Sequence, residues 1–137
     1  LIYINVVSNL KKKLIVLILL NFGLYSCESE KKYSDYNESD FIEAQGVITD
    51  VYLTSDPFDS PINKNIEFKY YMPNSTQLIG KENNLELNWA EKGVPIVVLV
   101  NKNDETISFY GRFGLKDTLS NGEKIFIKDF VSNMINK

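Results

Sequence analysis

The stretch Val94-Pro95-Ile96-Val97-Val98-Leu99-Val100 is the most apolar run after residue 26 and decides the fold. It is rich in β-branched residues and apolar on both alternating faces, which predicts a central strand covered on both sides. Gly93 is a turn residue directly before it, and Pro95 is expected at the strand's edge, where a missing N–H matters least. The remaining segments should therefore build a sheet around this strand.

A hairpin is predicted immediately downstream. Asn101-Lys102-Asn103-Asp104 has the composition of a tight turn. Thr106-Ile107-Ser108-Phe109-Tyr110 then reads as a strand and ends at Gly111. The two strands and their turn predict an antiparallel pair.

More extended segments precede the apolar run. In residues 47–53, Val47, Thr49 and Val51 alternate with Ile48, Asp50 and Tyr52, which predicts a strand, and residues 66–72 alternate in the same way. Residues 77–80 are expected to return as a short partner strand, and residues 85–89 form a further extended segment. Between the first two strands, residues 55–65 hold two prolines and many turn residues, which predicts a long loop.

The fold class that follows is mainly β. Strands joined mostly in sequence predict a small antiparallel barrel or twisted sheet with five or six strands.

The end of the chain has a different pattern. Ser120-Asn121-Gly122-Glu123 has the Ser-x-x-Glu spacing of a capping box. We expect a C-terminal amphipathic helix of about three turns that covers an open face of the sheet. The alternative is a final strand over residues 124–128, where Ile125 and Ile127 flank Phe126. The residues at helical intervals are Phe126, Ile127, Phe130, Val131, Met134 and Ile135.

The beginning of the chain resembles an export signal. An apolar run over residues 14–20 follows three basic residues, Lys11, Lys12 and Lys13, the order of a secretory signal peptide. The run is well short of the roughly 20 apolar residues that a membrane-spanning helix needs, so a permanent transmembrane helix is the weaker alternative.

The only cysteine follows this signal. Leu24, Tyr25, Ser26 and Cys27 form a sequence that resembles the lipobox of bacterial lipoproteins. The resemblance implies that the Cys27 thiol carries a diacylglycerol, that cleavage removes residues 1–26 and that the new amine is acylated. An unpaired thiol or an intermolecular disulfide is the alternative.

An acidic segment follows Cys27. Residues 28–40 are polar with few groups to bury, which predicts a flexible tether, assigned to residues 27–42. Glu28 and Glu30, with Ser29 between them, are similar to the surface-export signals of Bacteroidetes lipoproteins. A solvated spacer is the simpler reading. The β-domain with its helix is assigned to residues 43–137.

Composition excludes several classes of function. Beyond residue 26 the chain holds 12 basic and 18 acidic residues, a net charge of −6, which argues against nucleic-acid binding. There is no histidine, so Ser-His and Cys-His nucleophiles and the usual zinc sites are excluded. Only a carboxylate pair is left for catalysis. We expect no enzyme activity, no metal and no cofactor.

A second resemblance covers residues 46–109. The segments are Gly46-Val47-Ile48-Thr49-Asp50-Val51, Phe68-Lys69-Tyr70-Tyr71 and Lys92-Gly93. They are similar to an uncharacterised family of short β-domains in membrane-anchored bacterial proteins. The resemblance implies no catalytic residues.

Two sets of side chains are candidate binding sites. Asp56 and Asp59 in the long loop, and the cluster at residues 101–105, carry the hard oxygen ligands that calcium prefers, although turns favour Asp and Asn for backbone reasons alone. Tyr71, Tyr110 and Arg112 are a candidate ligand surface, with aromatic rings for stacking and a guanidinium for a carboxylate.

The function expected from these observations is a lipid-anchored lipoprotein of the cell envelope, held in the outer membrane through Cys27, that serves as a non-catalytic binding or scaffold module for an envelope protein. The alternative is an inhibitor or immunity-type lipoprotein that inserts the loop at residues 55–65 into the cleft of an envelope-attacking enzyme.

Overall fold

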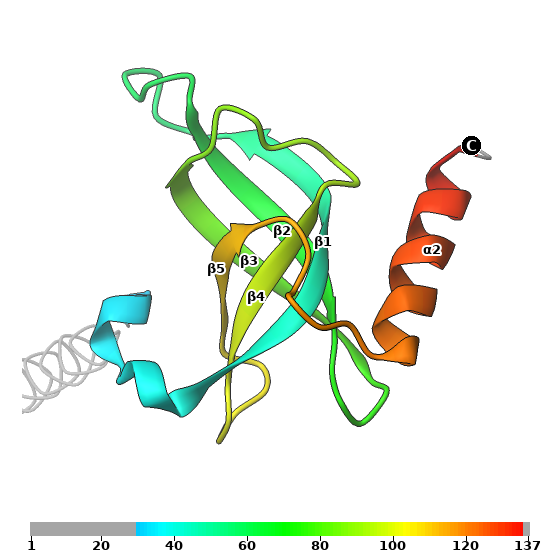
Figure 1. Cartoon of the computed structure of the whole chain (residues 1–137). Coiled ribbons are helices and arrows are strands. Elements are labelled where there is room, and N and C mark those ends of the chain that lie inside the picture. Colours follow the sequence, from blue (N-terminus) through cyan, green and yellow to red (C-terminus); the bar gives the residue numbers. More distant parts are fainter. Residues whose placement is uncertain (1–29, 136–137) are drawn as a thin grey trace, which may run out of the picture. The chain divides into compact units, whose positions relative to one another are not determined.

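The computed structural model describes residues 30–135; the predicted signal and lipobox, including Lys11, Lys12, Lys13 and Cys27, lie outside the described residues. The chain divides into two units between Lys32 and Tyr33, and the fold below is that of the second unit. No helix within residues 30–135 has the length and hydropathy to cross a bilayer. The elements in chain order are η1 (Tyr33–Asp35), η2 (Glu38–Asp40), β1 (Phe41–Leu53), β2 (Asn63–Tyr71), β3 (Gln77–Glu86), β4 (Pro95–Asn101), β5 (Ser108–Phe113) and α2 (Asn121–Ile135) (Figure 1).

The strands form one antiparallel sheet in the order β3-β2-β1-β4-β5, curled into a half-barrel (Figure 1). The edge strands β3 and β5 curl toward each other until they are in contact. Between these two edge strands, the backbone N–H of Tyr110 on β5 donates a hydrogen bond of 2.5 Å to the carboxylate of Glu82 on β3. The predicted mainly β fold is confirmed, with five strands.

β4 is apolar on both faces, as predicted, but it is not the middle strand. Ile96, Val97 and Val98 are fully buried. The middle position belongs to β1, whose 13 residues pair with both β2 and β4. An apolar run indicates that both faces of a strand are buried. In β4 the core covers one face, and the segment after β5 covers the other.

A bulge in β1 breaks the simple alternation expected for residues 47–53. The pairing with β2 shifts register between Ile48 and Asp50, so that Thr49 is the extra residue. Because of this shift, Ile48 and Val51 both pack against the inner core.

The inner face of the half-barrel holds the core. The phenol of Tyr70 is fully buried among apolar side chains, and its hydroxyl donates a hydrogen bond of 2.5 Å to the carbonyl of Glu105 in the β4–β5 turn. Burial of each large side chain contributes about 1.5–3 kcal/mol. The buried members of the core are Ala44, Ile48, Ile66, Phe68, Tyr70, Met72, Leu87, Ala90, Ile96, Val98 and Val100.

β3 is one strand where the sequence predicts two extended segments. Residues 77–86 are continuous, and the expected second segment at residues 85–89 continues into a turn. Asn84 adopts a left-handed φ of 57°, and the pairing with β2 shifts between Lys64 and Ile66. Asparagine tolerates this conformation, so the strand bends there and does not end.

The C-terminal helix is confirmed, and the alternative strand at residues 124–128 is wrong. The Ser120 hydroxyl accepts a hydrogen bond from the Glu123 N–H at 3.2 Å, and the Glu123 carboxylate accepts one from the Ser120 N–H at 2.8 Å. These reciprocal bonds are the predicted capping box. The Lys116 ammonium adds a 2.6 Å ion pair to the same carboxylate.

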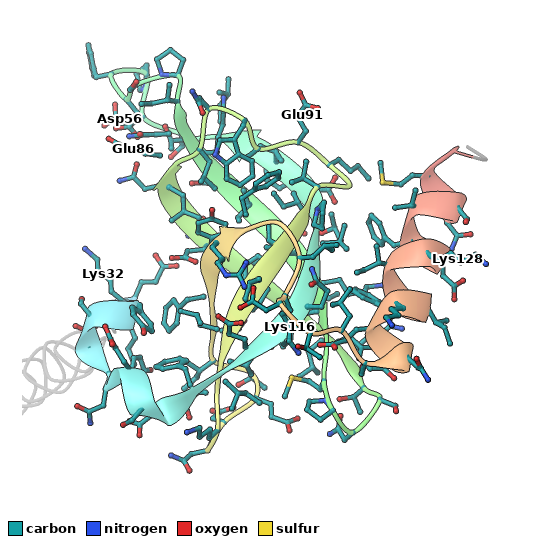
Figure 2. All side chains as sticks on the ribbon, in the orientation of Figure 1. Lys32, Asp56, Glu86, Glu91, Lys116 and Lys128 are labelled. Atoms are coloured by element: carbon teal, nitrogen blue, oxygen red, sulfur yellow. The ribbon has the colours of Figure 1, made fainter. Side chains whose placement is uncertain are left out.

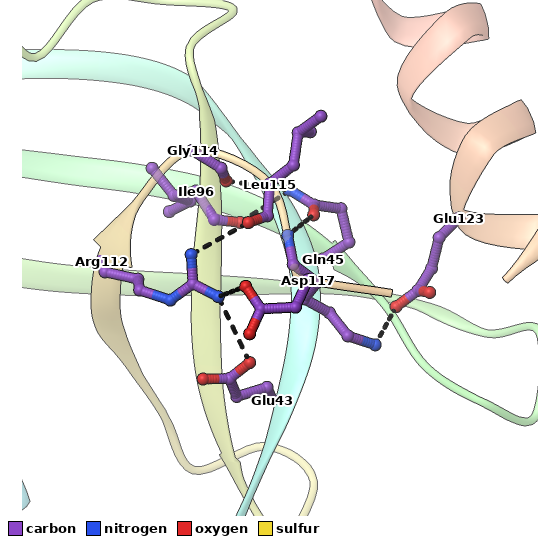
Figure 3. Close-up of polar contacts among 9 residues, drawn as sticks. Glu43, Gln45, Ile96, Arg112, Gly114, Leu115, Asp117 and Glu123 are labelled. Carbon is purple, nitrogen blue, oxygen red and sulfur yellow. Dashed lines mark hydrogen bonds and ion pairs between the residues drawn. The ribbon is translucent and has the colours of Figure 1, made fainter. Parts of the chain in front are cut away.

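A buried glutamine fastens the chain between β5 and α2 to the outer face of the sheet (Figure 3). The amide of Gln45 on β1 donates to the carbonyl of Ile96 at 3.0 Å, and its oxygen accepts from the N–H of Lys116 at 2.9 Å. Gln45 is fully buried, so its amide must find such partners inside the protein.

The folded unit begins earlier than the predicted boundary at residue 43. Two short turns, η1 and η2, precede β1, whose first residue is Phe41. The rings of Tyr33 and Tyr36 lie 5.0 and 5.7 Å from that of Phe41, and 5.9 and 6.0 Å from that of Phe109 on β5. Tyrosines that bury their rings in this way give a polar segment enough apolar contact to be ordered. The predicted tether is therefore too long at its C-terminal end.

Candidate functional site

The predicted ligand surface of Tyr71, Tyr110 and Arg112 is not one surface. Tyr71 lies on the outer face of β2, where its ring packs 5.9 Å from that of Phe126 on α2. Tyr110 packs against the inner core, with its ring 6.1 Å from that of Trp89. The two tyrosines therefore serve the packing of opposite faces.

Arg112 has partners within its own chain (Figure 3). Its guanidinium donates to the carbonyl of Leu115 at 2.9 Å and to the carboxylate of Asp117 at 3.2 Å, with the carboxylate of Glu43 at 3.7 Å. The ion pairs are exposed, so each contributes at most about 1 kcal/mol. Arg112 thus helps to hold the segment after β5 and is not a free anion clamp.

The predicted long loop joins β1 and β2 and spans residues 54–62, at one end of the half-barrel. The side chain of Asp56, labelled in Figure 2, accepts a hydrogen bond of 2.9 Å from the Phe58 N–H, and the Asp56 carbonyl accepts one of 3.1 Å from the Asp59 N–H. A second turn follows, in which the Asn63 N–H donates to the Ser60 carbonyl at 2.9 Å. Two successive turns give this loop a defined shape.

The loop presents apolar side chains to solvent. Phe58 is 95% exposed, the largest exposure of any large apolar side chain described. Leu53, at the end of β1, is 67% exposed. Exposed apolar groups that gather at one place mark interaction surfaces more often than isolated ones do. We use the name loop-end surface for the exposed apolar residues of this loop and its flanks, which are Tyr52, Leu53, Phe58 and Ile62.

Asparagine side chains next to the loop form hydrogen bonds between β2 and β3. The amide of Asn63 donates to the side-chain oxygen of Asn84 at 3.1 Å, and the N–H of Asn84 donates to the side-chain oxygen of Asn65 at 2.9 Å. Beside them lies a hollow of about 350 Å³. Within residues 30–135, no three histidine, cysteine or acidic side chains lie together as a metal site would need. The hollow is lined by Thr54, Ser55, Asp56, Asp59, Asn65, Asn83 and Asn84.

In the cluster at residues 101–105, side-chain oxygens accept hydrogen bonds from the backbone of the same turn. The side chain of Asn101 accepts hydrogen bonds from the N–H groups of Asn103 and Asp104 at 2.9 and 3.2 Å. The carboxylate of Asp104 accepts from the N–H and hydroxyl of Thr106 at 3.0 and 2.5 Å, and these bonds lower the pKa of Asp104. The turn explains why these residue types stand here.

The sequence predicts the loop that carries the loop-end surface, but it does not identify Phe58 as the exposed residue. The sequence predicts a long loop, but nothing in its pattern distinguishes Phe58 from a phenylalanine that folds back onto the core. No family model, curated protein or solved structure matches this chain. The candidate site therefore rests on the geometry of the loop.

Proposed function

We propose that this protein is a lipid-anchored lipoprotein of the cell envelope that binds a partner protein through the β1–β2 loop. The observation that carries the proposal is the 95% exposure of Phe58 on a loop shaped by two turns. A large aromatic side chain held by an ordered loop loses little conformational freedom on binding, and aromatic residues are the commonest anchors of protein interfaces.

Attachment through Cys27 favours a partner beyond the lipid surface. Five residues separate Cys27 from Tyr33, where the folded unit begins, so the chain between these two positions spans at most about 20 Å. β1 then leads from this end of the unit to the loop, and its 13 residues span up to about 40 Å. An attachment at Cys27 would therefore join the chain near the start of the unit, and β1 separates that start from the loop along the chain.

The proposal is tested by purifying the full-length acylated protein from its own envelope after cross-linking. Phe58→Ser should lower the yield of the cross-linked partner at least tenfold. Ile125→Ser is the matched control, because Ile125 is also an exposed apolar residue, 60% exposed, but lies on α2. Equal yields from the wild type and Phe58→Ser would contradict the proposal.

The same loop supports a second candidate, an inhibitor that inserts Phe58 into the cleft of an envelope-attacking enzyme. The two candidates differ in what the partner does. If the inhibitor role is right, cells that carry Phe58→Ser lose protection against lysozyme-type enzymes, and Ile125→Ser cells keep it. Unchanged protection in Phe58→Ser cells would rule out the inhibitor role and leave the binding module as the remaining candidate.

A further inference from the structure

A groove separates helix α2 from the outer face of β1 and β2. Its volume is about 550 Å³, within the range of small-molecule sites. We call it the α2 groove, defined by its lining residues Thr49, Lys69, Lys92, Phe130, Asn133 and Met134.

The groove stays open because α2 is held near its two ends. Near its start, Gly122 lies against the phenol of Tyr71, so closely that a methyl group there would overlap it. Near its end, Met134 lies against Gly93, where an added Cβ would come within 2.7 Å of the Met134 sulfur. Phe130 lies between these two attachments and is half-buried, so one side of its ring faces the groove.

Two of the lining residues of the α2 groove are ionisable, and both are lysines. Lys92 makes a long ion pair of 3.5 Å with Asp50, in which both side chains are largely exposed. Lys69 is half-buried and pairs across the strands with two apolar residues, Val47 and Ile79. Its ammonium makes no hydrogen bond or ion pair with any other described residue. Of the two lysines, Lys69 thus contributes a positive charge that has no ion-pair partner within residues 30–135.

We propose that the α2 groove binds a small organic carboxylate with a short apolar chain. The carboxylate fits the lysine side of the groove, because an ammonium without an ion-pair partner gains a charge-assisted hydrogen bond from an anion. The apolar chain fits against Phe130 and Met134, and the flexible thioether adapts to chains of different shape. Thr49 and Asn133 supply further hydrogen-bonding groups in the lining.

Two methionines give the experiment a built-in control. The chain holds only Met72, which is buried in the core, and Met134, which lines the groove. In the full-length protein in lipid nanodiscs with 13C-labelled methionine methyl groups, sodium hexanoate should shift the Met134 signal saturably and leave the Met72 signal in place. Acetate and 1-hexanol, which carry only one half of the proposed ligand each, should bind at least tenfold more weakly.

Variants then test the charge. Lys69→Gln should weaken hexanoate binding at least fivefold, with an unchanged Met72 signal as proof of folding. Lys81→Gln, on the neighbouring strand and paired with Glu67 at 2.5 Å, should stay within twofold of the wild type. The absence of a saturable Met134 shift, equal affinity in Lys69→Gln, or hexanol binding as tight as hexanoate binding would each overturn the proposal.

Discussion

The side-chain oxygen of Gln45 accepts a hydrogen bond of 2.9 Å from the backbone N–H of Lys116, which joins the middle strand to the segment that leads into α2. The amide of the same side chain also reaches the carbonyls of Gly46 and Ile96, at 3.1 and 3.0 Å. One buried side chain thus helps to fix where the chain runs after the sheet is complete, together with the contacts of Arg112 and Lys116.

Replacing Gln45 should therefore destabilise the whole unit. Gln45→Met keeps the approximate volume but removes the donor and the acceptor, which leaves the partly buried Lys116 N–H without that partner. We expect a loss of about 2–3 kcal/mol in the free energy of unfolding, measured by chemical denaturation. Gln77→Met, at an exposed position, should change it by less than about 0.5 kcal/mol. Similar stability of the two variants would mean that the Gln45 network is dispensable.

The start of α2 should make stability depend on pH. Burial alone raises the pKa of Glu123, but the bonds from Lys116 and Ser120 outweigh it and hold the pKa below its usual value. A carboxyl whose pKa is lower in the folded chain adds stability above its unfolded pKa and loses it as the pH falls through the folded pKa.

Glu123→Gln is the variant for this effect. It should lower the free energy of unfolding by about 1–3 kcal/mol at neutral pH, because it removes a charge-assisted pair. The difference from the wild type should shrink as the pH falls toward 3. Glu91→Gln, in an exposed turn, is the control. A difference that stays constant with pH would show that the charge of Glu123 adds nothing.

The closeness of the two edge strands depends on a glycine. A Cβ on Gly80 of β3 would overlap the ring of Phe68 and the hydroxyl of Ser108 on β5. Gly80→Ala should therefore lower the free energy of unfolding by about 1–3 kcal/mol, the usual effect of overpacking. Ile79→Ala, one residue earlier and 62% exposed, should have a much smaller effect in the same denaturation experiment. If Gly80→Ala is as stable as the wild type, β3 and β5 are not packed this closely.

The anchor makes a separate prediction. Cys27→Ala should abolish incorporation of a fatty-acid analogue and leave the precursor unprocessed, because the diacylated thiol is the proposed signal for cleavage. Intact-mass measurement of the native protein should give a chain that starts at Cys27 and carries acyl groups. Undiminished labelling of the variant, or a native chain with a bare thiol, would rule out the lipid anchor.

Much of the fold is predictable because local chemistry dictates it. The apolar run of β4 and the Ser120–Glu123 capping box need only neighbours in sequence. The turn after β4 was predicted as well, but it extends to residue 107, and the next strand, β5, runs over Ser108–Phe113 where residues 106–110 were predicted. The middle position of β1 and its bulge at Thr49 depend on pairing with two distant strands, which alternation alone does not encode. The order of residues 33–40 depends on Phe109, far along the chain, which the tyrosines of this segment contact.

The candidate site was predictable only as a loop. Turn residues between two strands predict a loop at residues 55–65, and the structure ends that loop at residue 62, where β2 follows. The exposure of Phe58 depends on the hydrogen bonds of Asp56 and of the neighbouring asparagines. Tyr71 and Arg112 were candidate ligand groups by residue type. Their partners, Phe126 and Asp117, come from segments whose positions the sequence does not reveal.

The most direct test of the proposed function is a photo-crosslinking amino acid placed at position 58 of the full-length protein in intact cells. We expect a discrete adduct with one envelope protein, and no such adduct when the crosslinker replaces Lys128, an exposed residue of α2 (Figure 2). Adducts that are the same at both positions, or none at position 58, would contradict the view that this loop binds the partner.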